Sequence, residues 1–115
     1  EKPIREQEEI FAGVTAALKQ DLAPDAVVAY TDTIAAWVYQ AAQDANRRIP
    51  DDLSVVGYNN NEFTLWMSPP LSSVGLDTFE TGAETIDLLN KRIGGENPPQ
   101  EPTVVPMQLH VRDSS

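Results

Sequence analysis

Two short apolar runs joined by an amphipathic helical segment constrain the fold of this chain more than any other feature. Residues 26–30 and 53–58 have the length of strands and show no polar–apolar alternation, which is typical of strands buried on both faces of a parallel sheet. Between them, residues 33–48 predict a helix that Thr31 or Asp32 can cap. The apolar face of this helix consists of Ile34, Val38, Ala41, Ala42 and Ala45. This order predicts a βαβ unit with parallel strands and a right-handed crossover.

Further elements are predicted on both sides of this unit. Residues 6–20 carry apolar side chains at helical spacing, and residues 72–76 predict a short strand. Residues 104–111 alternate, and Pro106 among them indicates an edge strand because proline cannot donate to a neighbouring strand. The predicted fold class is therefore α/β, a parallel sheet flanked by helices.

A third helix is predicted over residues 78–93. Asp77 and Glu80 stand where a capping box would begin this helix. Its expected buried face consists of Phe79, Ala83, Ile86, Leu89 and Ile93. The residues that follow, 96–102, are rich in proline and predict a linker.

Composition argues against several functions. The chain has no cysteine and one histidine, so a disulfide framework, a cysteine-ligated zinc site and a multi-histidine metal cluster are not expected. A net charge of −10 argues against binding to nucleic acid phosphates. Apolar runs stay short of the roughly 18 residues that a membrane helix needs. We therefore expect no metal, no cofactor, and no DNA or membrane partner for this stretch of chain.

Polar side chains follow both predicted central strands. Thr31 and Asp32 come after the first, and Asn59 and Asn60 come after the second. Because ligands bind beyond the carboxyl ends of parallel strands, these four residues are candidates for binding a polar small molecule. The alternative is that Asp32 only caps a helix and that the asparagines only form a turn.

Catalytic motifs give no comparable signal. The sequence contains no nucleophile elbow, Walker loop or dinucleotide fingerprint. His110 is expected to be a surface residue of the alternating strand. An enzyme is therefore not expected, and an uncharacterised α/β enzyme domain is disfavoured because no acid–base pair is evident.

The two tryptophans stand beside predicted elements rather than within their apolar faces. Trp37 flanks the core face of the second helix, and Trp66 lies in residues 63–67, which are apolar without a helical or strand period. Such a stretch is either a satellite core under the sheet edge or a surface that a partner buries.

Four sequence blocks in order resemble the LacI/GalR family of bacterial transcriptional regulators. They are APDAVVAYTD at 23–32, RIPDDLSVVGYNN at 48–60, PPLSSV at 69–74, and VP at 105–106 with the terminal VRDSS at 111–115. The resemblance implies a two-lobed fold of the periplasmic-binding-protein-like type I. Residues 1–71 and 103–115 would form most of the C-terminal lobe, and 72–94 would cross to the N-terminal lobe. The family's N-terminal helix-turn-helix is absent from these residues.

The resemblance also implies a function and its residues. Such regulators bind an effector, often a sugar or nucleobase, between the lobes and thereby change their affinity for operator DNA. The family's ligand-contacting carboxylate falls on Asn59, the polar residue before the aspartate falls on Thr31, and an often aromatic position falls on Arg5. A cytoplasmic homodimer is implied, with an interface at Ala36, Trp37, Gln40, Leu65, Trp66 and Met67. The alternative, a periplasmic sugar-binding receptor, shares the fold but does not account for the regulator-like VRDSS block.

Overall fold

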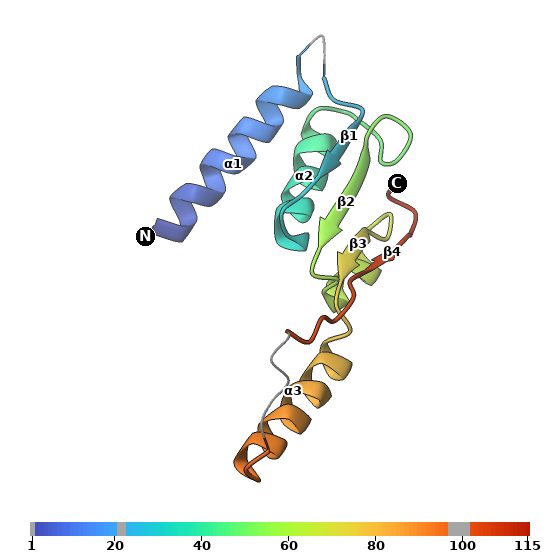
Figure 1. The fold of residues 1–115 in the computed structure, drawn as a ribbon. Helices are drawn as coiled ribbons and strands as arrows, with labels where there is room; N and C mark the ends of the chain where they lie inside the picture. Colours follow the sequence, from blue (N-terminus) through green and yellow to red (C-terminus); the bar gives the residue numbers. More distant parts are fainter. Residues whose placement is uncertain (1, 21–22, 97–101) are drawn as a thin grey trace.

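The computed structural model describes residues 2–20, 23–96 and 102–115, with side chains in the first helix described from Glu8 onward. Most of the predicted linker, residues 97–101, lies outside the described residues. In chain order the elements are α1 (Lys2–Leu18), β1 (Ala26–Val28), α2 (Asp32–Asp44), β2 (Ser54–Tyr58), the 3₁₀ helix η1 (Glu62–Trp66), β3 (Ser72–Gly75), α3 (Thr78–Ile93) and β4 (Gln108–His110) (Figure 1).

The strands form one sheet in the order β1-β2-β3-β4. The first three are parallel, with Val27 opposite Val55 and Val56 opposite Ser72. β4 runs antiparallel to β3 at the edge and places His110 opposite Ser73. The predicted βαβ unit and the predicted edge strand are both confirmed.

The core lies between the sheet and α2. Val38, Ala41 and Ala42 of α2 are fully buried or nearly so, and Ile34 and Ala45 pack against the same cluster, which confirms the predicted apolar face. Leu18 of α1 joins this core, and α1 lies against α2 (Figure 1). The other buried apolar residues are Ala29, Ala35, Leu53, Val55 and Leu71.

The opposite face of the sheet is open in the described chain. Val28 is 82% exposed and Leu109 of β4 is 57% exposed. The prediction that β1 is buried on both faces is therefore wrong for this stretch of chain. The lack of alternation correctly predicts a strand. Val28 is exposed because the described helices α1 and α2 cover only the face of the sheet that carries Val55.

α3 projects from the sheet with no buried residue (Figure 1). Asp77 caps it as predicted, because Oδ1 of Asp77 accepts from the N–H groups of Phe79 (3.0 Å) and Glu80 (2.9 Å). The predicted buried face is wrong: Phe79 is 87% exposed and Ile93 76% exposed. The projection gives the chain a radius of gyration of 18.6 Å, whereas a compact domain of this length has about 13 Å. No described helix is both long and apolar enough to cross a bilayer.

The last residues fasten the amino ends of β2 and β3. Ser114 is fully buried. Its hydroxyl donates to the carbonyl of Val55 (2.6 Å) and accepts from the N–H of Ser72 (2.8 Å), while its carbonyl accepts from the N–H of Val55 (2.7 Å). The VRDSS block therefore has a structural role that its composition alone did not indicate.

Candidate functional site

The loop after β2 is held in an unusual backbone conformation. Asn59 and Asn60 have φ of 104° and 52°, the left-handed region that asparagine tolerates better than most residues. Three consecutive N–H groups anchor this loop: that of Asn59 donates to the carbonyl of Val74 (2.8 Å), that of Asn60 to Oγ of Ser73 (3.0 Å), and that of Asn61 to Oδ2 of Asp32 (2.7 Å). The asparagine-rich turn therefore has a single fixed geometry.

Asp32 is the buried anchor of this loop. It is fully buried, and its Oδ1 accepts from the hydroxyl of Ser73 (2.6 Å) while Oδ2 also accepts from Nδ2 of Asn61 (3.1 Å). Gly57 makes room for this carboxylate, since a Cβ at that position would overlap Asp32 Oδ1 and lie 2.9 Å from Cδ2 of Leu71. As the structure stands, Asp32 exposes no atom to a ligand and acts as a positioning group.

The other predicted site residues lie at the same end of the sheet. Thr31 is half-buried and caps α2, with its Oγ1 accepting from the N–H of Ile34 (3.2 Å). Asn59 is exposed, and Asn60 is half-buried. The structure thus brings the residues after β1 and β2 together through the contact between Asp32 and Asn61. Arg5 falls in the part of α1 whose side chains lie outside the described residues.

Arg112 fixes the side chain of Asn60. Its guanidinium donates to Oδ1 of Asn60 (2.6 Å), to Oγ1 of Thr64 (3.1 Å) and to the carbonyl of Leu71. The loop also lies directly over Gly75, where a Cβ would come within 2.5 Å of Cβ of Asn60. Sequence reasoning missed the roles of Ser73, Asn61 and Arg112. Arg112 lies in the VRDSS block, which indicated the family resemblance but did not predict that Arg112 contacts Asn60.

A polar hollow of about 250 Å³ opens beside Asn60. Its lining comes from the loop after β2, from the turn between β3 and α3, and from β4: Asn60, Leu76, Asp77, Thr78, Gln108 and His110. His110 was expected at the surface and is instead half-buried beside this hollow. The arrangement offers amides, an imidazole and a hydroxyl to a polar small molecule.

The residues predicted for self-association lie on α2 and on η1 with the residue that follows it. Leu65 is 51% exposed and Trp66 73% exposed, whereas Met67 packs against the core. A second hollow is lined by Ala36 and Gln40 of α2 and by Ser68 and Pro69, which follow Met67. The hydroxyl of Tyr39 donates to the carbonyl of Pro69 (3.0 Å) and holds this segment against α2. Trp37 of the same helix is half-buried.

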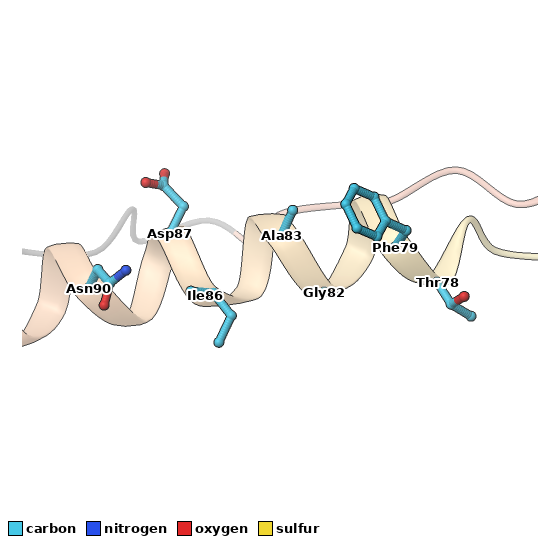
Figure 2. Close-up of a pocket in the computed structure, with 7 residues that line it drawn as sticks. All are labelled: Thr78, Phe79, Gly82, Ala83, Ile86, Asp87 and Asn90. Carbon is cyan, nitrogen blue, oxygen red and sulfur yellow. The ribbon is translucent and has the colours of Figure 1, made fainter.

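The exposed side of α3 carries an open hollow of its own. Its lining includes Thr78, Phe79, Gly82, Ala83 and Ile86, and Figure 2 shows Phe79 and Ile86 projecting from the helix. This surface is mostly apolar, with Asp87 and Asn90 at one end, and follows one stretch of helix, so it resembles half of a packing interface more than a ligand site.

Comparisons with known proteins agree with this architecture. Residues 2–115 match the family model described as periplasmic binding protein-like domain, which defines the class of protein. The ribose operon repressor of Haemophilus influenzae is 40% identical over 85 residues, which are 74% of this chain and 26% of the repressor. The lactose operon repressor of Rhizobium radiobacter is 35% identical over 80 residues, 70% of this chain and 71% of that protein.

Solved structures indicate the same family. A LacI family transcriptional regulator from Arthrobacter sp. FB24 in complex with lactose superimposes with a TM-score of 0.84 and 29% identity, over 94% of this chain and 41% of that one. This chain therefore belongs to the LacI family of periplasmic-binding-protein-like regulators. It spans only about a quarter to a third of most of the relatives it matches, so it corresponds to part of their effector-binding domain.

Proposed function

We propose that this chain is the effector-sensing and self-association part of a bacterial DNA-binding transcriptional regulator. A small molecule, a sugar or related metabolite, would bind at the Asn59 end of the sheet and change the parent protein's affinity for operator DNA. The main support for this proposal is the loop of residues 59–61, which is held by hydrogen bonds and lies beside an open polar hollow. The names of the relatives, repressors of ribose and lactose operons, favour a regulator over a periplasmic receptor and over an enzyme. A cytoplasmic location forms part of the proposal.

We assign different roles to the predicted site residues. Asn59, Thr31 and Asn60 are proposed contacts of the effector, because each presents polar atoms at the carboxyl end of the sheet. Asp32 positions the loop and does not touch the effector, because it is fully buried. Arg5 stays a proposed contact on the strength of the family resemblance alone.

We propose that α3 crosses to a second lobe, with residues 1–71 and 103–115 in the lobe that the sheet defines. The exposed apolar side of α3 supports this division, since an amphipathic helix without a partner leaves its apolar surface in water. β3 pairs with both β2 and β4, which supports placing residues 72–75 with this sheet and beginning the proposed crossing after Gly75.

An NMR titration of the isotope-labelled chain tests the effector site. D-ribose, lactose, glucose and sucrose serve as probes, and at least one should shift the amide signals of Thr31 and Asn59 saturably. The test variant is Asn59→Gly rather than Asn59→Ala, because the φ of 104° would strain an alanine. Loss of the amide should weaken binding about tenfold, the effect of leaving a buried partner unpaired.

Asn59→Asp is the matched control for that titration. It keeps an acceptor at the same position and tolerates the same backbone conformation, so it should retain most of the affinity. Equal dissociation constants for Asn59→Gly and the wild type would remove Asn59 from the site. If none of the four sugars shifts any of these signals, the proposed sugar-sensing function fails.

DNA binding is proposed for the parent protein and not for this chain. The net charge of −10 disfavours binding to the phosphates of DNA. A mobility-shift assay at low salt should show free DNA at every concentration of the chain. A salt-sensitive shifted band would contradict this part of the proposal.

We propose a two-fold symmetric homodimer that buries Trp66 and Leu65 against α2 of a second copy, beside Ala36, Trp37 and Gln40. Exposed aromatics are typical interface anchors, and loss of one costs about 2 kcal/mol or more, roughly 30-fold in affinity. Sedimentation velocity should show a dimer for the wild type and a monomer for Trp66→Asp. Ile93→Asp, which charges an apolar position on α3 that is 76% exposed, is the matched control and should stay dimeric. A Trp66→Asp variant that still sediments as a dimer would contradict this interface.

A further inference from the structure

We infer that the polar side of β4 belongs to the effector site, where Gln108 and His110 contact a neutral polyhydroxylated ligand and determine specificity. This inference rests on the proposed function and adds a strand and a ligand class to it. Neither residue was predicted as part of the site, and both enter it through the pairing of β4 with β3.

The polar and apolar residues of β4 lie on opposite sides of the sheet. Gln108 lies opposite Gly75 and His110 opposite Ser73, so both share the side of the sheet on which Asp32 and the loop over Gly75 lie. The apolar residues point away, with Leu109 57% exposed and Val111 69% exposed. The polar side chains of β4 therefore share the side of the sheet that carries the hollow beside Asn60.

The hollow on that side of the sheet is smaller than a complete small-molecule pocket. Its volume is about 250 Å³, below the roughly 300–1,000 Å³ of complete small-molecule pockets. Asn60 and β4 both contribute to its lining, and Arg112, two residues after His110, donates to Oδ1 of Asn60 at 2.6 Å. β4 therefore supplies two lining residues, and Arg112, which follows the strand, positions a third.

The remaining polar groups of the hollow select the ligand chemistry. Oδ1 of Asp77 is already used in capping α3, and Oδ1 of Asn60 is used by Arg112. In the described part of the chain, the lining still offers the Gln108 amide, the His110 imidazole, the Thr78 hydroxyl, Nδ2 of Asn60 and Oδ2 of Asp77. An amide and a neutral imidazole each combine a donor with an acceptor, as a sugar hydroxyl does. The Asp77 carboxylate and a net charge of −10 disfavour a phosphorylated sugar.

The single histidine of the chain makes the inference directly measurable. In a titration of the ¹³C,¹⁵N-labelled chain with D-ribose and lactose, His110 gives one imidazole Cε1–H signal. A sugar that shifts the Asn59 amide should also shift this signal and the side-chain amide signals of Gln108. Saturable shifts at Asn59 with both of these signals unmoved would overturn the inference and leave the proposed function standing. If D-ribose, lactose, glucose and sucrose all leave the three signals unmoved, the proposed function fails and this inference fails with it.

Three variants and one further probe separate contact from strand stability. His110→Ala and Gln108→Ala should each weaken binding about tenfold. Leu109→Ala, on the opposite side of the same strand, should bind like the wild type. An equal loss in Leu109→Ala would show that the effect comes from the strand, and would overturn the contact. Ribose 5-phosphate should bind more weakly than D-ribose, and tighter binding would overturn the assignment of a neutral ligand.

Discussion

The guanidinium of Arg112 donates to the side-chain oxygen of Asn60 at 2.6 Å, across 52 positions of sequence. The same guanidinium also donates to Oγ1 of Thr64 at 3.1 Å. One side chain at the end of the chain therefore joins the loop of the candidate effector site to η1, the segment that carries the exposed Trp66. The fork of the guanidinium allows these contacts at once.

Replacement of Arg112 by lysine should loosen the loop of residues 59–61. A lysine ammonium is a point charge without the planar fork and cannot hold the same partners together. Hydrogen exchange at the amides of Asn60 and Asn61 should become about tenfold faster, since a hydrogen bond to a charged group contributes about 1.5–3 kcal/mol. Arg92→Lys, at an exposed position of α3, should leave these amides unchanged. Equal exchange rates in Arg112→Lys and the wild type would contradict a positioning role.

Two glycines offer opposite predictions for the same substitution. Gly57→Ala should lower the free energy of unfolding by about 1–3 kcal/mol, the usual effect of overpacking, because the new Cβ meets Asp32 and Leu71. Gly82→Ala should raise it by about 0.5–1 kcal/mol, because nothing lies within 4 Å of its Cβ and alanine favours a helix. Urea unfolding followed by circular dichroism measures both. A Gly57→Ala variant as stable as the wild type would show that Asp32 can move without cost.

Local pattern predicted the elements, because periodicity and capping are properties of neighbouring residues. The apolar face of α2 and the Asp77 cap of α3 are examples, and both are confirmed. Periodicity does not tell whether a partner lies within the same stretch of chain. The apolar side of α3 and the exposed Val28 were therefore expected to be buried and are not.

The residues predicted for the candidate site lie at one end of the sheet, but the sequence did not indicate several of the residues that contact them there. The rule for parallel strands placed Thr31 and Asn59 there, since it depends only on the order of the elements. The role of Asp32 depends on Ser73, 41 positions away, and on Asn61, 29 positions away. Such contacts have no local signature, and for the same reason the alternating pattern of β4 could not tell which of its sides faces the site.

Ser114 is predicted to stabilise the chain although it lies next to the terminus. Ser114→Ala leaves the buried N–H of Ser72 without its acceptor, which should lower the free energy of unfolding by about 1–3 kcal/mol. Ser68→Ala, at an exposed position before Pro69, is the matched control and should change stability little. Thermal or urea midpoints of the two variants measure the difference. Equal midpoints would mean that the VRDSS block does not fasten β2 to β3.

The turn between α2 and β2 gives a prediction for acid unfolding. Hydrogen bonds from the side chain and the backbone N–H of Arg48 lower the pKa of Asp52 from 3.8 to about 2. Because the folded state favours the ionised carboxylate, this contribution to stability is present above about pH 3.8 and is lost as the pH falls toward about 2. Asp52→Asn should therefore be less stable than the wild type near neutral pH, and the two should converge in that acid range.

Asp51→Asn removes the same charge and one exposed ion pair of 3.3 Å, so it should follow the wild-type curve closely. Thermal midpoints measured across this pH range test the point, and a constant gap between Asp52→Asn and the wild type down to the lowest pH would contradict it.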